Sequence, residues 1–349
     1  MNRLIYSVCL VFLASCSSEI SREVLLTNAT GTPGNIQVLM ENDLWNGPIG
    51  QTVTVAFEEY AAGVYLRPES TFDYFQIGPS QFDGALRKTR NIFQIRLRND
   101  TSYTESVLKE YVDLYAYGQY YVQIVDSDEN RLLQTVREKM PEVVDMFNAS
   151  ENSRLVNQFN KDFHLSIDES AQKNMGFSIH LPVKSELKVE EEGFMWIKHD
   201  RSQTQMSTGD NQFDSGTFWI QQGFVLWETP YSDSALNVSN ILMDRDTILK
   251  YNVPGKIKGS YMGTEYDEYY SPEAKEINYN GSKAVKMYGL WKHKGDVGAF
   301  GGGPFVQISI QNEARNSVIN VCGYIYAPKF DKREYIREID ALLETITLL

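Results

Sequence analysis

The sequence predicts an α+β protein, with mixed α/β layers in two halves that follow an N-terminal export signal. Three observations support this prediction. A short apolar run at the N-terminus ends at a cysteine, strand-like and helix-like segments alternate from residue 35 to about residue 170, and β-branched and aromatic runs dominate residues 171–349. A hydrophobic content of 42% and an aromatic content of 12% are those of a folded globular protein.

The first sixteen residues have the parts of a bacterial lipoprotein signal in the usual order. Arg3 supplies a positive charge, residues 4–13 are mostly apolar, and the small residues Ala14 and Ser15 precede Cys16. An apolar run of about ten residues is half of what a helix needs to cross a bilayer, and it fits a signal-peptide core. The pattern resembles the bacterial lipobox, in which the cysteine is lipidated and becomes the first residue of the mature chain.

We therefore expect residues 1–15 to be a signal peptide and Cys16 to attach the protein to a membrane through lipid. A plain secretory signal that happens to contain a cysteine is the alternative. Residues 16–34 are polar and rich in small residues, so they predict a flexible tether between the lipid and the folded body.

Strands and helices alternate in the first half, residues 35–170. Strands are expected at 35–40, 72–78, 91–98 and 119–126, and helices at 52–60, at 105–118 ("ESVLKEYVDLYAYG") and from Glu129 onward, with Pro141 starting a new helix. The order β-α-β-β-α-β resembles a ferredoxin-like half. The polar segment "SIDESAQKNMG" (166–176) is the expected boundary to the second half.

The second half, residues 171–349, is richer in strands. They are expected in "FSIHLPV", "FMWIKHD", "GTFWIQQGFVLWETP", "KAVKMYGLWKH", "PFVQISIQN" and "SVINVCGYIYAP". One helix is expected from about Asn240 to Tyr251, where "NVPG" stops it. The C-terminal segment places Ile336, Ile339 and Leu343 on one face, which predicts an amphipathic helix packed on the sheet.

Charge and cysteine content exclude several function classes. The net charge of −13 becomes −14 when Arg3 is cleaved away, which argues against nucleic acid as a partner and against broad attraction to anionic lipid. With Cys9 in the signal and Cys16 lipidated, only Cys322 remains, so no intramolecular disulfide forms. Cys322 lies in a strand-like run without a neighbouring histidine, and we interpret it as a small buried apolar residue.

No catalytic, metal or nucleotide motif stands out. The four histidines are widely spaced, and HExxH, CxxC, EF-hand and GxSxG patterns are missing from the sequence. The glycines of "GAFGGGPF" (298–305) lead into a strand instead of a helix, which predicts a tight β connection with close backbone packing and no nucleotide site. We therefore assign no catalytic residue, no metal and no cofactor.

Two weaker features suggest sites. The segment "TEYDEYYSPEAKE" (264–276) combines acids with Tyr266, Tyr269 and Tyr270, which we expect to be exposed and to bind a ligand. Its acids also allow paired carboxylates for glycan hydrolysis, although a charged run is usually a solvated loop. Asp233-Ser234-Ala235 is similar to the acceptor sequence of Bacteroidota protein O-glycosylation, which marks Ser234 as a weak glycosylation site.

Several landmarks, in the same order along nearly the whole mature chain, resemble an uncharacterised family of Bacteroidota lipoproteins classed as a domain of unknown function. They are "DLWNGPIG" (43–50), "KTRNIFQI" (88–95), "PYSDS" (230–234), "RDTILKYNVPG" (245–255), "GSYMGTE" (259–265), "GLW" (289–291) and "GGPFV" (302–306). The family carries no known activity, so the resemblance transfers no catalytic residue. It implies a Gram-negative envelope and an outer-membrane lipoprotein.

The sequence thus predicts a non-enzymatic, outer-membrane-anchored binding or assembly module whose partner is an envelope protein or a glycan. An envelope hydrolase that acts on glycan or peptidoglycan through the acids of 264–276 is the alternative. The periplasmic face is favoured over the cell surface, because Glu19 is the one acid in the stretch just after the cysteine, where surface-exported lipoproteins tend to carry an acidic cluster.

Overall fold

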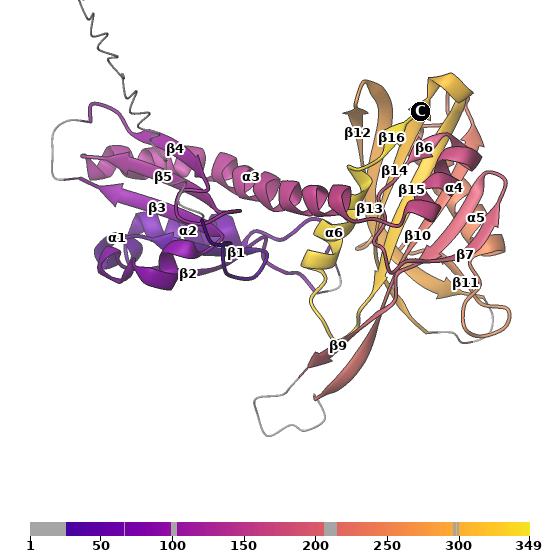
Figure 1. Ribbon diagram of the computed structural model, residues 1–349, viewed down its shortest axis with the longest axis horizontal. Coiled ribbons are helices and arrows are strands. Elements are labelled where there is room, and N and C mark those ends of the chain that lie inside the picture. Colours follow the sequence, from indigo (N-terminus) through magenta and orange to yellow (C-terminus); the bar gives the residue numbers. More distant parts are fainter. Residues whose placement is uncertain (1–25, 66, 99–102, 206–214, 296–297, 299) are drawn as a thin grey trace, which may run out of the picture.

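The computed structural model describes residues 26–65, 67–98, 103–205, 215–295, 298 and 300–349. Two lobes, each built on its own sheet, are joined by one long helix (Figure 1). The α+β class predicted from the sequence is confirmed, and the first half is a small α/β region. Within the described residues, no helix is both long enough and apolar enough to cross a bilayer.

The N-terminal lobe contains a five-stranded, mostly parallel sheet. Its strands are β1 (Asn35–Leu39), β2 (Asp73–Ile77), β3 (Asn91–Leu97), β4 (Val107–Val112) and β5 (Tyr120–Asp126), in the order β2-β1-β3-β5-β4. Neighbouring strands run parallel except β4, which is antiparallel to β5 and forms an edge. Parallel strands are buried on both faces, which explains why β3 and β5 are apolar over most of their length.

Helices cover one face of this sheet. α1 (Asn42–Trp45), α2 (Pro48–Glu58) and the first half of α3 (Glu129–Lys161) pack on alternate strand residues such as Ile36 and Val38. The 3₁₀ helices η1 (Pro79–Gln81) and η2 (Gly84–Lys88) lie in the segment that covers the other face, where Phe82 and Leu86 pack against Leu39 and Ile92.

Helix α3 connects the lobes. Its 33 residues span about 50 Å at 1.5 Å per residue. Leu132, Val136 and Phe147 pack in the core of the N-terminal lobe, whereas Phe159 packs in the core of the C-terminal lobe. The middle of the helix therefore crosses the gap between the two sheets (Figure 1).

The C-terminal lobe contains a nine-stranded antiparallel sheet with the order β11-β13-β14-β15-β10-β8-β7, to which β12 and β9 add at β13 and β10. Its strands are β7 (Glu186–Glu191), β8 (Phe194–Lys198), β9 (Arg201–Gln205), β10 (Gly216–Pro230), β11 (Tyr261–Thr264), β12 (Glu273–Tyr279), β13 (Ser282–Lys294), β14 (Gly302–Asn312) and β15 (Ser317–Tyr326). A small pair, β6 (Phe177–Ser178) and β16 (Thr347–Leu348), lies beside it.

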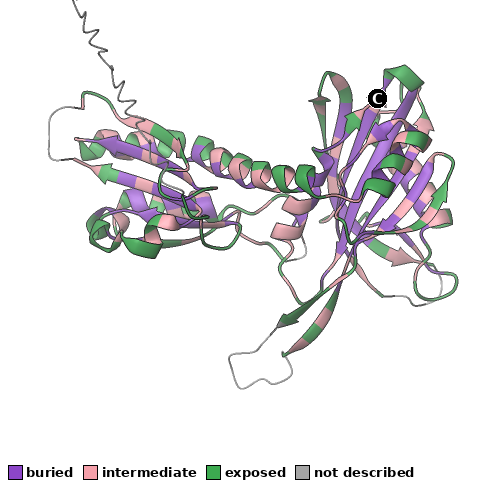
Figure 2. Ribbon diagram, viewed as in Figure 1, coloured by how far each residue is buried: buried purple, intermediate pink, exposed green. Residues whose placement is uncertain are grey.

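Both faces of this sheet are buried, as the purple strands in Figure 2 show. α4 (Leu165–Met175) and α6 (Arg333–Leu343) cover one face, and α5 (Val238–Asn252) covers the other. The predicted amphipathic C-terminal helix is confirmed, because Ile336, Ile339 and Leu342 of α6 lie in the core. The helix expected near Asn240–Tyr251 is confirmed as α5.

The close backbone packing expected in the glycine segment 298–305 is confirmed where it enters β14. A Cβ added to Gly303 would lie 2.1 Å from the carbonyl oxygen of Ile325, and one added to Gly302 would lie 2.5 Å from that of Trp291. Only glycine fits between the neighbouring strands at these positions. Cys322, on β15, is fully buried, and burial raises the pKa of its thiol.

The ferredoxin-like element order is wrong, because residues 105–118 do not form a helix. Residues 107–112 form β4, which pairs with β5, and 113–119 form a turn. The N-terminal lobe therefore has one helical segment after β1, then four strands, then α3. The apolar side chains of "VLKEYV" fit a helix as well as an edge strand, and pairing with β5 decides between them.

Two predictions around α3 also need correction. Pro141 lies inside the helix instead of starting a new one, and Val136, Met140 and Val143 on both sides of it pack in the core. Packing therefore outweighs the missing hydrogen bond of the proline. The polar segment 166–176, expected as a boundary, forms α4, which buries Ile167 and Met175 in the C-terminal lobe.

The ordered body begins before residue 35, so the expected tether of residues 16–34 is shortened. The backbone N–H of Ala29 donates to Tyr117 O, and that of Thr30 donates to Lys88 O, each at 2.8 Å. Residues 28 and 30 form bridges to Tyr117 and Thr89. The segment from residue 27 is thus paired to the N-terminal lobe.

Candidate functional site: a groove along helix α3

The tyrosines of the 264–276 segment lie in a loop that Tyr266 joins to α5. The hydroxyl of Tyr266 donates to Asp246 Oδ2 on α5 at 2.8 Å, and Lys294 Nζ lies 5.1 Å from the centre of its ring. Tyr269 is 83% exposed, and Tyr270 is half-buried. Five well-formed cavities among the described residues have no lining residue from 264–276.

Two acids of this segment, Glu265 and Asp267, have structural partners. Burial alone would raise the pKa of Glu265, but the Lys292 ammonium and backbone N–H groups outweigh it and lower that pKa. Asp267 Oδ1 accepts the backbone N–H of Tyr269 at 3.0 Å. Both carboxylates therefore stabilise the loop, which leaves no specific support for paired catalytic acids.

The other residues singled out from the sequence have simple positions. Ser234 is exposed in the turn before α5, so its hydroxyl is accessible. Cys16 lies outside the described residues. In the described part of the chain, no group of three or more His, Cys, Asp or Glu side chains is placed to hold a metal ion.

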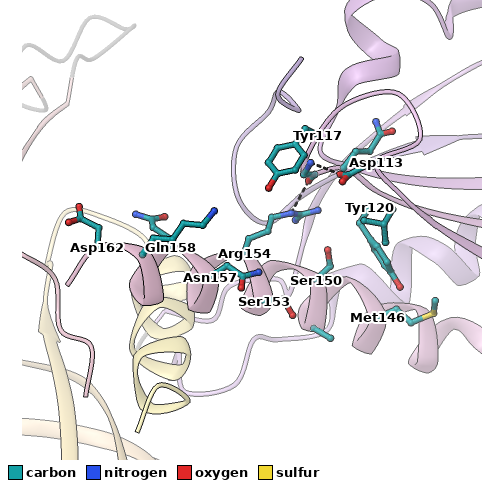
Figure 3. Close-up of a pocket in the computed structure, with 15 residues that line it drawn as sticks. Asp113, Tyr117, Tyr120, Met146, Ser150, Ser153, Arg154, Asn157, Gln158 and Asp162 are labelled. Carbon is teal, nitrogen blue, oxygen red and sulfur yellow. Dashed lines mark hydrogen bonds between the residues drawn. The ribbon is translucent and has the colours of Figure 1, made fainter. Parts of the chain in front are cut away.

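A groove with a volume of about 930 Å³ runs along the second half of α3 (Figure 3). One wall is the exposed face of the helix, from Met146 to Asp162, and the other is the turn after β4, from Val112 to Tyr120. The helix residues that line the groove belong to the part of α3 that continues from the N-terminal lobe toward the C-terminal lobe. Its volume is in the range of a small-ligand site.

A buried ion cluster fixes α3 against the sheet at this point. Glu151 on α3 is 1% exposed, and its Oε1 accepts a hydrogen bond of 2.6 Å from Asn91 Nδ2. Its other oxygen pairs with Arg90 at 2.5 Å, and Arg154 lies 3.1 Å from Glu151 Oε1. Asn91 begins β3, so the cluster joins the helix to the N-terminal edge of the parallel strands.

Arg154 connects this cluster to the opposite wall of the groove. Its Nε donates to Gly118 O at 3.0 Å, and its two terminal nitrogens donate to Asn91 Oδ1 and Arg90 O. Burial lowers the pKa of Arg154, while the Glu151 carboxylate acts in the opposite direction. The guanidinium therefore holds the turn and the helix at a fixed separation (Figure 3).

The turn itself is held in a defined shape. Asp113 has a φ of 56° and Gly118 a φ of 79°, and the Asp113 carboxylate accepts the Gly118 N–H at 2.5 Å. The Gln119 side chain donates to Arg87 O and Thr89 O, each at 2.7 Å. A residue other than glycine at φ above zero is uncommon, and such positions concentrate at functional sites.

The helix wall presents hydrogen-bonding groups that have no partner within the described structure. Ser150, Ser153 and Asn157 follow one another at the spacing of one helical face, and Gln158 lies beside them. Above them stands Tyr117, which is 59% exposed. An aromatic ring beside unpaired hydroxyls and amides suits a ligand that has both apolar faces and hydrogen-bonding groups, such as a glycan or an extended peptide.

A second cavity, of about 670 Å³, lies between α3 and α6 and adjoins the groove, with which it shares Ala149 and Ser153 of α3. Its charged groups already serve the contact between the lobes. Arg333 donates to Asp73, Glu334 and Ser70 O, and Arg337 donates to Glu334, Thr71 O and Asn148. This cavity therefore marks the connection between the lobes, and the groove is the better candidate for binding.

The groove residues carry no sequence motif that predicts a binding site. The available signal was the segment "MFNASENSRLVNQFNK", where small and amide side chains replace the apolar face of a predicted helix. A helix segment without an apolar face does not pack on a sheet there, so that face of the helix stays open to solvent. The matching wall, 112–120, is not recognisable because residues 105–118 are predicted as a helix and 119–126 as a strand.

Two family models match consecutive parts of the chain. Residues 164–345, which are 182 of 349 residues, match a family described as "Domain of unknown function (DUF4837)". The chain belongs to this family. Residues 29–160 match a second one, "Domain of unknown function (DUF8532)". The two matches meet between residues 160 and 164, where α3 ends, so DUF4837 corresponds to the C-terminal lobe.

Similar solved structures are distant. A protein of unknown function from Pseudomonas aeruginosa, PA94, is 13% identical, with 44% of this chain and 84% of that chain covered and a TM-score of 0.24. The Ran-binding protein Mog1p of Saccharomyces cerevisiae is 8% identical, with 50% and 90% covered and a TM-score of 0.30. At these TM-scores neither likeness says anything about the activity of this chain. No curated protein matches.

Proposed function

We propose that the protein is a non-enzymatic, lipid-anchored binding module of the Bacteroidota outer membrane, which holds an envelope protein segment or a glycan in the α3 groove. Attachment is through Cys16, at the end of the lipobox-like signal. The observation that carries the binding role is the wall of partner-free hydroxyls and amides beneath Tyr117, held open by Arg154.

The proposal includes the side of the membrane and a modification site, and it is favoured over a rival function. The protein faces the periplasm, because no acidic cluster follows Cys16. The exposed Ser234 is accessible for O-glycosylation. The rival function, a hydrolase using the acids of 264–276, has weaker support, since Glu265 and Asp267 bind Lys292 and the backbone of their own loop.

The groove is tested by filling it. In Ser153→Trp a large indole enters the groove from the exposed face of α3, so capture of the ligand should fall about tenfold or more, which corresponds to ~1.4 kcal/mol. Full-length tagged protein is crosslinked in the cells that express it and purified from their membranes. The protein and sugar captured with it are then quantified.

Ser239→Trp is the matched control, because Ser239 is also an exposed helical serine but lies on α5, on the other lobe. It should leave capture unchanged. Equal capture by wild type and Ser153→Trp would show that the groove is not the binding site.

A further inference from the structure

An exposed apolar surface adjoins the groove on the N-terminal lobe. Within six consecutive residues, four large apolar side chains expose between 36 and 70% of their surface, and a fifth, from the N-terminal segment, exposes 38%. They are Val112, Leu114, Tyr115, Tyr117 and Leu26. We call these five residues the 112–117 surface. Contiguous exposed apolar groups mark a contact with another molecule or with lipid.

The described part of the chain starts at this surface. Asn28 pairs with Tyr117, and the Tyr117 N–H donates to Thr27 O at 2.9 Å, so Leu26 lies next to the turn. Cys16 precedes Leu26 by ten residues (26 − 16). Ten residues reach at most about 36 Å when fully extended. A lipid on Cys16 therefore keeps the 112–117 surface close to the bilayer.

The chemistry of the surface suits a lipid–water interface. Tyrosine rings with one apolar and one polar end are enriched at membrane interfaces. The Arg87 guanidinium lies 5.7 Å from the ring centre of Phe82 and 6.0 Å from that of Tyr115, which places a cation beside the surface where lipid phosphates lie. The one acid inside the turn, Asp113, is occupied by the Gly118 N–H.

We propose that the 112–117 surface lies against the lipid headgroups and upper acyl chains of the membrane that holds the protein. This inference rests on the proposed lipid anchor. Val112 and Tyr117 belong both to this surface and to the wall of the groove. The rim of the groove therefore lies at headgroup level, and its ligand is a molecule at the membrane surface.

The test places a polarity-sensitive fluorophore on the full-length lipidated protein. With Cys16 acylated and Cys322 buried, Leu114→Cys provides a single reactive thiol. Met243→Cys, at an exposed position on α5, is the matched control, and Val112→Cys is a second probe if Leu114→Cys folds poorly. The proteins are reconstituted in vesicles of phosphatidylethanolamine and phosphatidylglycerol and floated on a density gradient.

We expect the emission of the Leu114 probe to shift to shorter wavelength on reconstitution and to be quenched by brominated acyl chains, with no change at Met243. Water-like emission at both Leu114 and Val112 in protein that floats would overturn the inference and leave the anchor intact. A shift that requires added envelope protein would assign the surface to a protein partner instead. Protein that fails to float would refute the anchor and this inference with it.

Discussion

Replacing Cys16 with alanine is expected to move most of the protein from the membrane fraction to the soluble fraction. Each buried methylene contributes about 0.8 kcal/mol, so several acyl chains hold a protein essentially permanently, whereas one chain holds it only weakly. Among the described residues no helix replaces that anchor by crossing the bilayer. The five residues of the 112–117 surface should give only weak, reversible binding without the lipid.

The measurement is membrane fractionation combined with metabolic labelling by an alkyne fatty acid. Cys322→Ala is the control, since it removes the buried thiol of β15 and should change neither localisation nor labelling. If the Cys16→Ala protein stays in the membrane and still takes up the label, the lipid is attached elsewhere and the proposed anchor is wrong.

The second large effect is expected from Glu151→Ala, which should lower the free energy of unfolding of the N-terminal lobe by about 3 kcal/mol or more. The substitution leaves Arg90 and Arg154 without their buried carboxylate, and it removes one of the two acceptors of Asn91 Nδ2, which keeps Asn35 O. Breaking a buried ion cluster by removing one partner typically costs 3–5 kcal/mol, of which the unpaired charges are the main part.

Hydrogen exchange of the amides of β1, β3 and β5 measures this loss in the N-terminal lobe alone. Glu142→Ala is the matched control on the same helix, because Glu142 is exposed and pairs only with Lys139 three residues earlier. An exposed pair contributes about 0–1 kcal/mol. Equal effects of the two substitutions would show that the Glu151 cluster does not fix α3 to the sheet.

The elements that the sequence could predict are those that bury a regular face. β14 alternates apolar residues with Gln307, Ser309 and Gln311, β15 is a nearly continuous β-branched and aromatic run, and α6 repeats apolar residues at helical spacing, so each pattern favours the structure that forms. Edge strand β4 is different, because its half-exposed residues fit either a helix or a strand until β5 pairs with it. Pro141 predicts the start of a new helix, but core packing on both sides of it keeps α3 continuous.

The groove was beyond sequence prediction because its walls are far apart in the chain. Arg154 reaches Gly118 across 36 positions and Asn91 across 63, so no local pattern brings them together. The cluster of Tyr266, Tyr269 and Tyr270 predicts a ligand site from the sequence. In the structure the Tyr266 hydroxyl donates to Asp246, which holds the tyrosine loop on α5.

The most direct test of the binding role is photo-crosslinking from the groove in living cells. A photoreactive amino acid replaces Asn157, whose exposed side chain lines the groove, or Ser239 on α5 as the control. After irradiation the membrane-bound protein is analysed for covalent adducts. We expect one defined adduct from Asn157 and none from Ser239. The absence of an adduct at Asn157, or the same products from both positions, would contradict a ligand-binding groove along α3.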